Sequence, residues 1–141
     1  MIRKFEKQDL DAVMSIWLCS NIDAHAFINP DYLKKNFDIV KKMIPHAEVY
    51  LLENNHEIKG FIGMIENKIA GIFVNKSDRS KGIGTELLNF AKKYHKKLYL
   101  SVYEKNERAI YFYKKNGFKI EKINIDKDTV QKEYIMLWEQ E

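Results

Sequence analysis

The chain has 141 residues, of which 45% are hydrophobic and 31% are charged. That length and balance fit one globular domain with a core of its own, so we assign residues 1–141 to a single domain. Every apolar run is shorter than the roughly 20 residues of a membrane-spanning helix, and the charged start does not resemble a secretory signal. We therefore expect a cytoplasmic protein with no membrane partner. The single cysteine, Cys19, excludes an internal disulfide.

The net charge is +4, from 24 lysines and arginines against 20 acids. The basic residues are spread along the whole chain, as on a solvated surface, whereas a nucleic-acid-binding protein concentrates them in a patch. We therefore expect no nucleic-acid partner. The four histidines and the one cysteine are scattered as well, so we expect no metal site.

The first part of the chain predicts a short strand and two helices. Residues 2–5 alternate in polarity, and the first helix is indicated by apolar residues at helical spacing: Leu10, Val13, Met14 and Trp17. Residues 19–28 show no period and are predicted to form a loop. The second helix begins at Asn29-Pro30, because Asn caps helices and Pro fits the first helical position, and Pro45 ends it.

The rest of the chain alternates strands with helices. Strands are predicted at residues 48–52, 58–65, 69–74, 98–103, 118–123 and 133–138. One helix carries an apolar stripe made of Leu87, Leu88, Ala91 and Tyr94, and a second helix spans 106–116. Strand 69–74 carries apolar residues on both of its faces, which predicts a central strand that is covered on both sides of the sheet. The order β-α-α-β-β-β-α-β-α-β-β indicates an α+β fold.

A glycine turn joins strand 69–74 to the next helix, with the sequence Arg79-Ser80-Lys81-Gly82-Ile83-Gly84-Thr85. A turn of this kind directs several backbone N–H groups at one point, and the helix dipole adds positive potential there. Glycine also lets a ligand approach the main chain. The segment is neither a Walker A loop nor a dinucleotide fingerprint, which would need glycine in place of Leu87. It predicts a phosphate-binding turn, with a plain strand-to-helix turn as the alternative.

A second motif follows one strand later: Asn106-x-x-Ala109-x-x-Phe112-Tyr113-x-x-x-Gly117-Phe118. Together with Arg79-x-x-Gly82-x-Gly84 and the order of the elements, it resembles the GCN5-related N-acetyltransferase (GNAT) family. The segment Ala24-His25-x-Phe27-Ile28 resembles a small bacterial single-domain branch of that family. The resemblance implies a mixed, mostly antiparallel central sheet with helices on both faces and a splayed parallel strand pair.

The resemblance also implies acetyl-CoA as the acyl donor, bound between strands 69–74 and 98–103. The main chain of Ile72 and Val74 would pair with the pantetheine arm, and an N–H near Phe73 would polarise the thioester carbonyl. The residues expected to bind the donor are Ile72, Phe73, Val74, Arg79, Ser80, Lys81, Gly82, Ile83, Gly84, Thr85, Asn106, Ala109, Phe112 and Tyr113. For Asn106, a role as helix cap is the alternative, and it does not exclude ligand contact.

Three residues are expected to take part in catalysis. Tyr113 matches the family's general acid, since a phenol with a pKa near 10 stays protonated at neutral pH and can donate to a thiolate; a core aromatic is the alternative. Glu66 and His25 are candidate general bases, and each is equally well explained as a solvated surface side chain. The resemblance places the acceptor site at His25, Phe27, Tyr32, Tyr103 and Glu104.

The sequence thus predicts an acetyl-CoA-dependent N-acetyltransferase. The acceptor is a primary amine, on a protein lysine, a protein N-terminus or a small molecule, and it attacks the thioester directly in a ternary complex. A non-catalytic acyl-CoA-binding sensor or interaction module is the alternative, and an acyl donor longer than acetyl stays open. The chain is expected to be a monomer or a homodimer.

Overall fold

The computed structural model describes residues 1–24 and 27–141. The helices are α1 (Leu10–Ala24), α2 (Pro30–Met43), α3 (Ile83–Lys93) and α4 (Glu107–Lys115), with short 3-10 turns at η1 (Lys7–Asp9), η2 (Ile44–His46) and η3 (Lys76–Asp78). The strands are β1 (Ile2–Lys4), β2 (Glu48–Asn54), β3 (Glu57–Ile65), β4 (Lys68–Val74), β5 (Lys97–Tyr103), β6 (Lys119–Ile125) and β7 (Lys132–Glu139). The expected order of helices and strands is confirmed.

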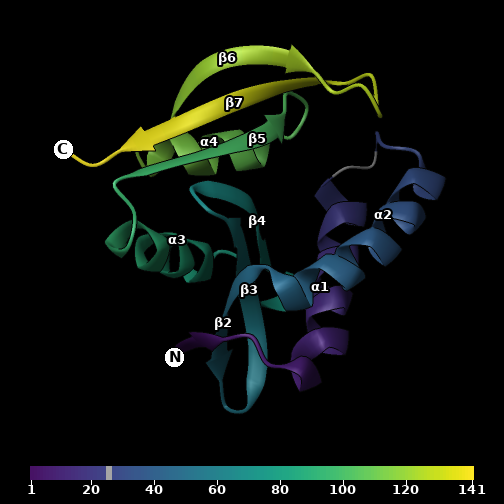
Figure 1. The fold of residues 1–141 in the computed structure, drawn as a ribbon, viewed down its shortest axis with the longest axis vertical. Coiled ribbons are helices and arrows are strands. Elements are labelled where there is room, and N and C mark those ends of the chain that lie inside the picture. The colour runs from purple at the N-terminus through teal and green to yellow at the C-terminus, as the bar shows by residue number, and fades with distance from the viewer. Residues whose placement is uncertain (25–26) are drawn as a thin grey trace.

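The strands form a seven-stranded sheet in the order β1-β2-β3-β4-β5-β7-β6. Neighbours are antiparallel except β4 and β5, which are parallel. Figure 1 shows β2, β3 and β4 as one half of the sheet and β5, β7 and β6 as the other, with the two halves diverging between β4 and β5. The predicted mixed, mostly antiparallel sheet is therefore confirmed.

The core has two parts, on opposite faces of the sheet. Helices α1 and α2 cover one face with a cluster that includes Val13, Met14, Trp17, Val49, Leu51 and Phe61. Helices α3 and α4 cover the other face with a cluster that includes Leu87, Leu88, Leu98, Leu100, Tyr113 and Met136. The alternation predicted for β5 holds, since Leu98, Leu100 and Val102 are buried while Tyr99 and Ser101 are exposed.

Two helix ends differ from the sequence prediction. Residues 19–24, expected in a loop, continue α1, because tertiary contacts hold a polar last turn that has no apolar period. The Ser20 hydroxyl donates to the Val74 carbonyl at 3.4 Å, and the Asp23 carboxylate lies 3.5 Å from the Arg79 guanidinium. Conversely, Tyr94, expected in the buried stripe of α3, follows the end of that helix and is 70% exposed.

Strand β4 is central in the sheet, and helices pack against both of its faces, as predicted. Of its residues only Ile69 is buried, and Ala70 is exposed. Ile72 and Val74 pack against the cluster on the α3 and α4 side, and Phe73 packs against the cluster on the α1 and α2 side, but all three are only half-buried. The strand separates from β5 after its first residue, which leaves this edge of β4 unpaired.

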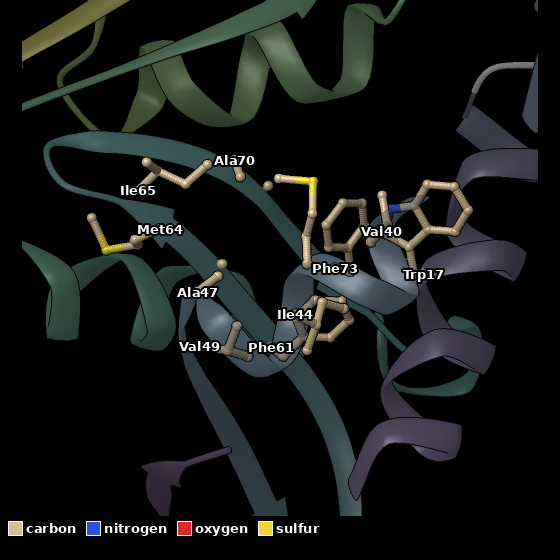
Figure 2. Close-up of a pocket in the computed structure, with 13 residues that line it drawn as sticks. Trp17, Val40, Ile44, Ala47, Val49, Phe61, Met64, Ile65, Ala70 and Phe73 are labelled. Atoms are coloured by element: carbon tan, nitrogen blue, oxygen red, sulfur yellow. The ribbon is translucent and has the colours of Figure 1, made fainter. Parts of the chain in front are cut away.

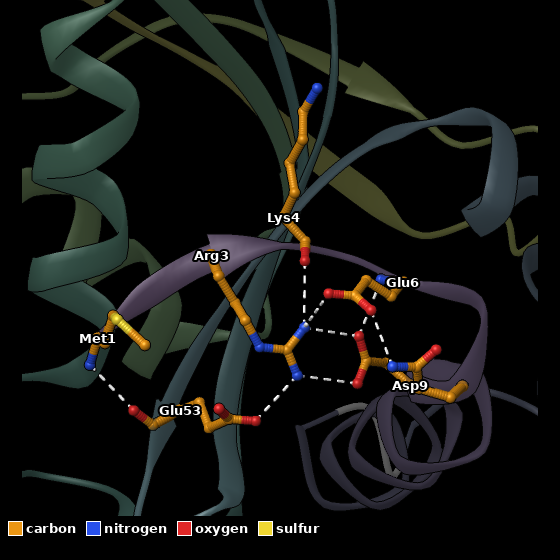
Figure 3. A network of polar contacts seen from close by, with 7 residues as sticks. Met1, Arg3, Lys4, Glu6, Asp9 and Glu53 are labelled. Carbon is orange, nitrogen blue, oxygen red and sulfur yellow. Dashed lines mark hydrogen bonds and ion pairs between the residues drawn. The ribbon is translucent and has the colours of Figure 1, made fainter.

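A partly buried ion-pair network fixes the N-terminal strand (Figure 3). The Arg3 guanidinium donates to the Asp9 carboxylate at 2.8 Å and 2.9 Å and to the Glu53 carboxylate at 2.9 Å. Asp9 is only 5% exposed, and its carboxylate also accepts the Glu6 backbone N–H at 2.8 Å. The hydrogen bond from Arg3 lowers the pKa of Asp9. The network ties β1 to β2 and to the start of α1.

Candidate active site

The parallel strands β4 and β5 meet at one end only. Along the described length of both strands the register holds a single pair, Lys68 with Tyr99, next to a 3.0 Å hydrogen bond from the Tyr99 N–H to the Asn67 carbonyl. Beyond it the two strands diverge toward their C-terminal ends (Figure 1). A β-bulge contributes to this, because Gly63 faces Gly71 while Met64 faces Ile69, which leaves one extra residue on β4. Such a bulge bends a strand and increases its twist.

The main chain of β4 is directed alternately to its two sides. The Asn75 N–H donates to the Lys59 carbonyl at 2.8 Å, which makes these two residues a hydrogen-bonded pair between the ends of β4 and β3. Because such pairs alternate along an antiparallel ladder, the peptide groups of Ile72 and Val74 point away from β3, into the gap beside β5. The same alternation turns the N–H of Phe73 toward β3. The gap is thus lined by the main chain of Ile72 and Val74.

The glycine turn lies directly after the open end of β4. Gly82 caps α3 with φ +83°, a conformation that favours glycine, and a Cβ placed there would meet nothing within 4 Å. The first-turn N–H groups of α3, from Ile83 to Thr85, have no acceptor within the helix. Arg79 is 3.5 Å from Asp23, and the Lys81 ammonium is 3.5 Å from Asp78. The turn therefore presents an open main-chain surface with the positive end of the helix dipole behind it.

Gly84, the second glycine of the turn, has a different environment. A Cβ at this position would lie 3.2 Å from the Phe112 ring, so α3 and α4 approach one another closely there. Phe112 is half-buried, and so is Ala109 one turn earlier on α4. The structure thus brings the two sequence motifs into direct contact through Gly84 and Phe112.

Helix α4 carries Asn106 and Tyr113. The Asn106 side-chain oxygen accepts the Ala109 N–H at 3.3 Å, so Asn106 caps the helix. Tyr113 is buried, with its ring centroid 5.1 Å from that of Phe112 and 5.4 Å from that of Phe118. Burial raises the pKa of Tyr113, so the phenol keeps its proton at neutral pH. The structure thus shows Tyr113 as a core aromatic, and its role as general acid stays a prediction.

Three of the predicted acceptor residues meet near the C-terminal end of β5. A pocket of about 110 Å³ is lined by Phe27, Ile28, Asn29, Tyr32, Asp128 and Thr129. The ring of Phe27 packs edge-on against Tyr103 at 5.6 Å, and the Tyr103 hydroxyl donates to the Asp126 carboxylate at 2.7 Å. The Glu104 carboxylate instead accepts the Tyr134 hydroxyl at 3.2 Å. His25 lies outside the described residues.

Lys105 of the chain itself contacts the aromatic ring of Phe27, which lines this pocket. The Lys105 ammonium lies 5.6 Å from the centroid of the Phe27 ring, within the range of a cation–π interaction. A lysine ammonium of the chain is therefore already placed at the Phe27 ring, and the Asp126 carboxylate is held by Tyr103, which contacts the same ring.

Asp126 and Glu133 are two acids of this region that are not among the predicted catalytic and acceptor residues. Burial alone would raise the pKa of Asp126, but hydrogen bonds from Tyr103, from the Asp128 N–H and from Thr129 outweigh it and lower the pKa. Glu133 faces Tyr103 across β7 and β5; burial and the neighbouring charge of Asp126 raise its pKa. The pairing of Glu133 with Tyr103 is set by strand register, which no sequence spacing reveals.

Glu66 lies away from this cluster. It occupies the exposed turn between β3 and β4 with φ +55°, at the closed end of the β4–β5 pair. The glycine turn is at the other end of β4, about 20 Å along the strand at the usual rise per residue.

Comparisons with known proteins agree with this geometry. A family model described as an acetyltransferase (GNAT) domain matches residues 45–120. The chain belongs to the GNAT family. Its full length is similar to the peptidyl-lysine N-acetyltransferase YiaC of Escherichia coli, with 31% identity over 98% of this chain and 96% of that protein. It is also 30% identical to the E. coli peptidyl-lysine N-acetyltransferase YjaB, over 84% and 82% of the two chains. We conclude that the protein is an N-acetyltransferase.

Solved structures support the same fold. The solution structure of the apo form of YjaB from E. coli superposes with a TM-score of 0.89 at 24% identity, covering 100% of this chain and 98% of the other. A GNAT acetyltransferase from Bacillus cereus superposes with a TM-score of 0.76 at 22% identity, covering 100% and 97%. In the part of the chain that the structure describes, no group of three or more potential metal ligands occurs, and no helix has the length and apolar character to cross a membrane.

Proposed function

We propose that this GNAT protein transfers the acetyl group of acetyl-CoA to the side-chain amine of a protein lysine. The separation of β4 from β5 after the Lys68–Tyr99 pair carries the proposal, because it leaves the peptide groups of Ile72 and Val74 directed into a gap. That gap opens toward the glycine turn at Gly82. A thioester with a long amide-containing arm and a pyrophosphate fits this arrangement, in which the peptide groups of β4 are followed by the N–H groups of the glycine turn.

The residues around the gap have different roles in binding and catalysis. The peptide groups of Ile72 and Val74 bind and orient the amide arm, and an N–H on this side of β4 polarises the thioester carbonyl. The turn from Arg79 to Thr85 holds the pyrophosphate by main-chain donors. As the amine nitrogen bonds to the carbonyl carbon, the carbon–sulfur bond breaks, and Tyr113 donates its proton to the sulfur. Its raised pKa keeps that proton in place until the thiolate forms.

A lysine acceptor is favoured by the pocket at the end of β5. The cation–π contact between Lys105 and the Phe27 ring shows that this ring accommodates a lysine ammonium. Asp126, held by Tyr103 at 2.7 Å, supplies negative charge beside it. The relatives YiaC and YjaB are named peptidyl-lysine N-acetyltransferases, in agreement with this choice.

The amine must lose a proton before it attacks. We propose Glu133 as the base, because it is half-buried opposite Tyr103 at the acceptor end of the gap and its pKa is raised. A carboxylate with a raised pKa accepts a proton more readily near neutral pH. Glu66 and His25 stay as the alternatives from the sequence; Glu66 sits at the closed end of the strand pair.

Calorimetric titration with acetyl-CoA, and with CoA as comparison, tests the donor site. We expect micromolar binding of both, since the turn and the gap contact the parts that they share. Gly82→Glu should abolish it, because this change places a negative side chain and a strained backbone at the turn. Failure of the wild-type protein to bind either ligand would refute the proposal. Tight binding without acetylation of any lysine peptide would favour a non-catalytic acyl-CoA sensor.

A further inference from the structure

A second pocket lies on the α1 and α2 side of the sheet, along β3 and β4. Its volume is about 120 Å³, several times what one ordered water needs. Figure 2 shows it extending from the rings of Trp17 and Phe73 to Ile65 and Ala70 near the β3–β4 turn. The residues that line it belong to α1, α2, η2, β2, β3 and β4, plus Ala47 between η2 and β2.

Part of the floor of this pocket, at Gly63, is main chain without a side chain above it. Gly63 of β3 and Gly71 of β4 face one another in the strand register. A Cβ at Gly63 would meet nothing within 4 Å, so the space above it is open. At Gly71 the Phe73 ring occupies the space where a Cβ would be. Gly63 thus leaves a hollow where an ordinary side chain would have filled the face, and Gly71 makes room for the Phe73 ring beside it.

The lining of the pocket selects an apolar occupant. Of the described residues around it, none has a titratable side chain: all are hydrophobic or glycine. A lysine ammonium would lose its hydration there without a compensating partner, which is costly. We therefore assign the acceptor amine to the pocket at Phe27 and Asp128. The pocket along β3 and β4 suits an apolar group instead.

We propose that this pocket holds the alkyl chain of an acyl-CoA longer than acetyl, so that the enzyme also transfers short acyl groups of about three to five carbons. The proposal rests on the proposed function, since it takes the thioester to lie beside β4. The transfer is unchanged: a carbon–nitrogen bond to lysine forms, the carbon–sulfur bond breaks, and CoA leaves as the thiol.

Continuity with the donor strand favours an acyl chain over an apolar side chain of the acceptor protein. Gly71 and Phe73, which line the pocket, flank Ile72, whose peptide group points into the gap proposed for the thioester arm. An alkyl group attached to a carbonyl bound at β4 is therefore delivered to the pocket by the same strand. A side chain of the acceptor protein has no such attachment to β4.

The experiment compares acetyl-CoA with butyryl-CoA, in calorimetry and in the acylation of a lysine peptide. Two further methylenes in an apolar pocket should tighten binding of butyryl-CoA about tenfold. Gly63→Val fills the open space with a residue that strands accommodate well, so it should remove this advantage and leave acetyl-CoA within about twofold. Gly63→Ala fills less of the open space than Gly63→Val does. Lys119→Val, which introduces a valine at an exposed site on β6, is the matched control.

The possible outcomes separate the two proposals. A preference for butyryl-CoA that Gly63→Val or Gly63→Ala abolishes and Lys119→Val retains supports the acyl pocket. Equal or weaker binding of butyryl-CoA by the wild-type protein overturns it while leaving the proposed acetyl transfer intact. An increase in the KM for the peptide alone on filling Gly63 also overturns it, because the pocket would then hold the acceptor. Absence of binding by either thioester refutes the proposed function itself, and the pocket's role with it.

Discussion

The hydroxyl of Tyr103 donates a 2.7 Å hydrogen bond to the carboxylate of Asp126, joining the end of β5 to the segment that follows β6. The two residues are 23 positions apart in the chain. Tyr103 also packs edge-on against Phe27, which follows the end of α1. One tyrosine therefore holds together three separate parts of the proposed lysine pocket, and it orients the carboxylate that a cationic acceptor would meet.

Replacing Tyr103 tests this arrangement. Tyr103→Phe keeps the ring against Phe27 and removes the hydrogen bond to Asp126, which leaves the carboxylate less firmly placed. A hydrogen bond to a charged group is worth about 1.5–3 kcal/mol, so we expect the KM for a lysine peptide to rise roughly tenfold. The Kd for acetyl-CoA, measured by calorimetry, should stay the same. A loss confined to acetyl-CoA binding would contradict the placement of Tyr103 on the acceptor side.

Tyr113→Phe should lower kcat by about 10²–10³, because proton donation to the leaving thiolate is lost while packing in the core is retained. The exposed Tyr111 lies on the same helix and is 69% accessible, so Tyr111→Phe is the matched control and should leave kcat unchanged. Since burial raises the pKa of Tyr113, the wild-type rate should not decline through pH 9 from loss of this proton. Unchanged turnover of the Phe variant across pH would remove Tyr113 from the mechanism.

The pH dependence of kcat/KM distinguishes the two glutamates. A base works in its deprotonated form, so activity through Glu133 should fall as pH drops through a pKa raised above its ordinary 4.5. Glu133→Gln should remove that acid limb and reduce kcat/KM at pH 7 by about 10²-fold. Glu66→Gln, in the exposed turn, should change neither. The reverse result would assign the base to Glu66, as the sequence allowed.

Asn106 combines two separable roles. Asn106→Ala removes the cap on the Ala109 N–H and should destabilise the protein by about 1 kcal/mol in urea denaturation. Asn106→Ser retains a capping oxygen and should restore most of that stability. If the side-chain amide also binds the pantetheine arm, both variants should bind acetyl-CoA about equally weakly. Recovery of affinity along with stability in the Ser variant would show that the cap alone matters.

The Arg3 network should govern stability in acid. Because the pKa of Asp9 is lowered in the folded state, its contribution is fully present above the unfolded-state pKa near 3.8 and is lost as pH falls through the lower folded value. Asp9→Asn should cost about 1.5–3 kcal/mol at pH 7 and flatten the stability profile below pH 4. Glu6, 4.0 Å from Arg3 and exposed, supplies the control: Glu6→Gln should cost at most about 1 kcal/mol. Equal losses in both variants would argue against a special role for the buried carboxylate.

Local features of the sequence were sufficient for the order of elements, for the family and for the glycine turn. Helix caps such as Asn29 and Asn106, the alternation of Leu98, Leu100 and Val102, and the positive φ of Gly82 depend on residues within a few positions of one another. Conformational preferences that depend on such close neighbours can be recognised from one amino-acid sequence. The polar last turn of α1 was missed because Asp23 depends on Arg79, 56 positions later, for its ion pair.

Register and long-range packing decided the rest. The spacing of residues in the sequence does not predict that Glu133 lies opposite Tyr103 or that Gly63 faces Gly71. Nor does it predict the extra residue that bends β4 away from β5. The family resemblance indicated Phe27, Tyr32 and Tyr103 as acceptor residues, and in the folded chain Phe27 and Tyr32 line one pocket while Tyr103 packs against Phe27. Such relationships arise only when strands pair and helices dock. For the strand residues, a shift of one residue in register would turn a group such as Glu133 to the opposite face.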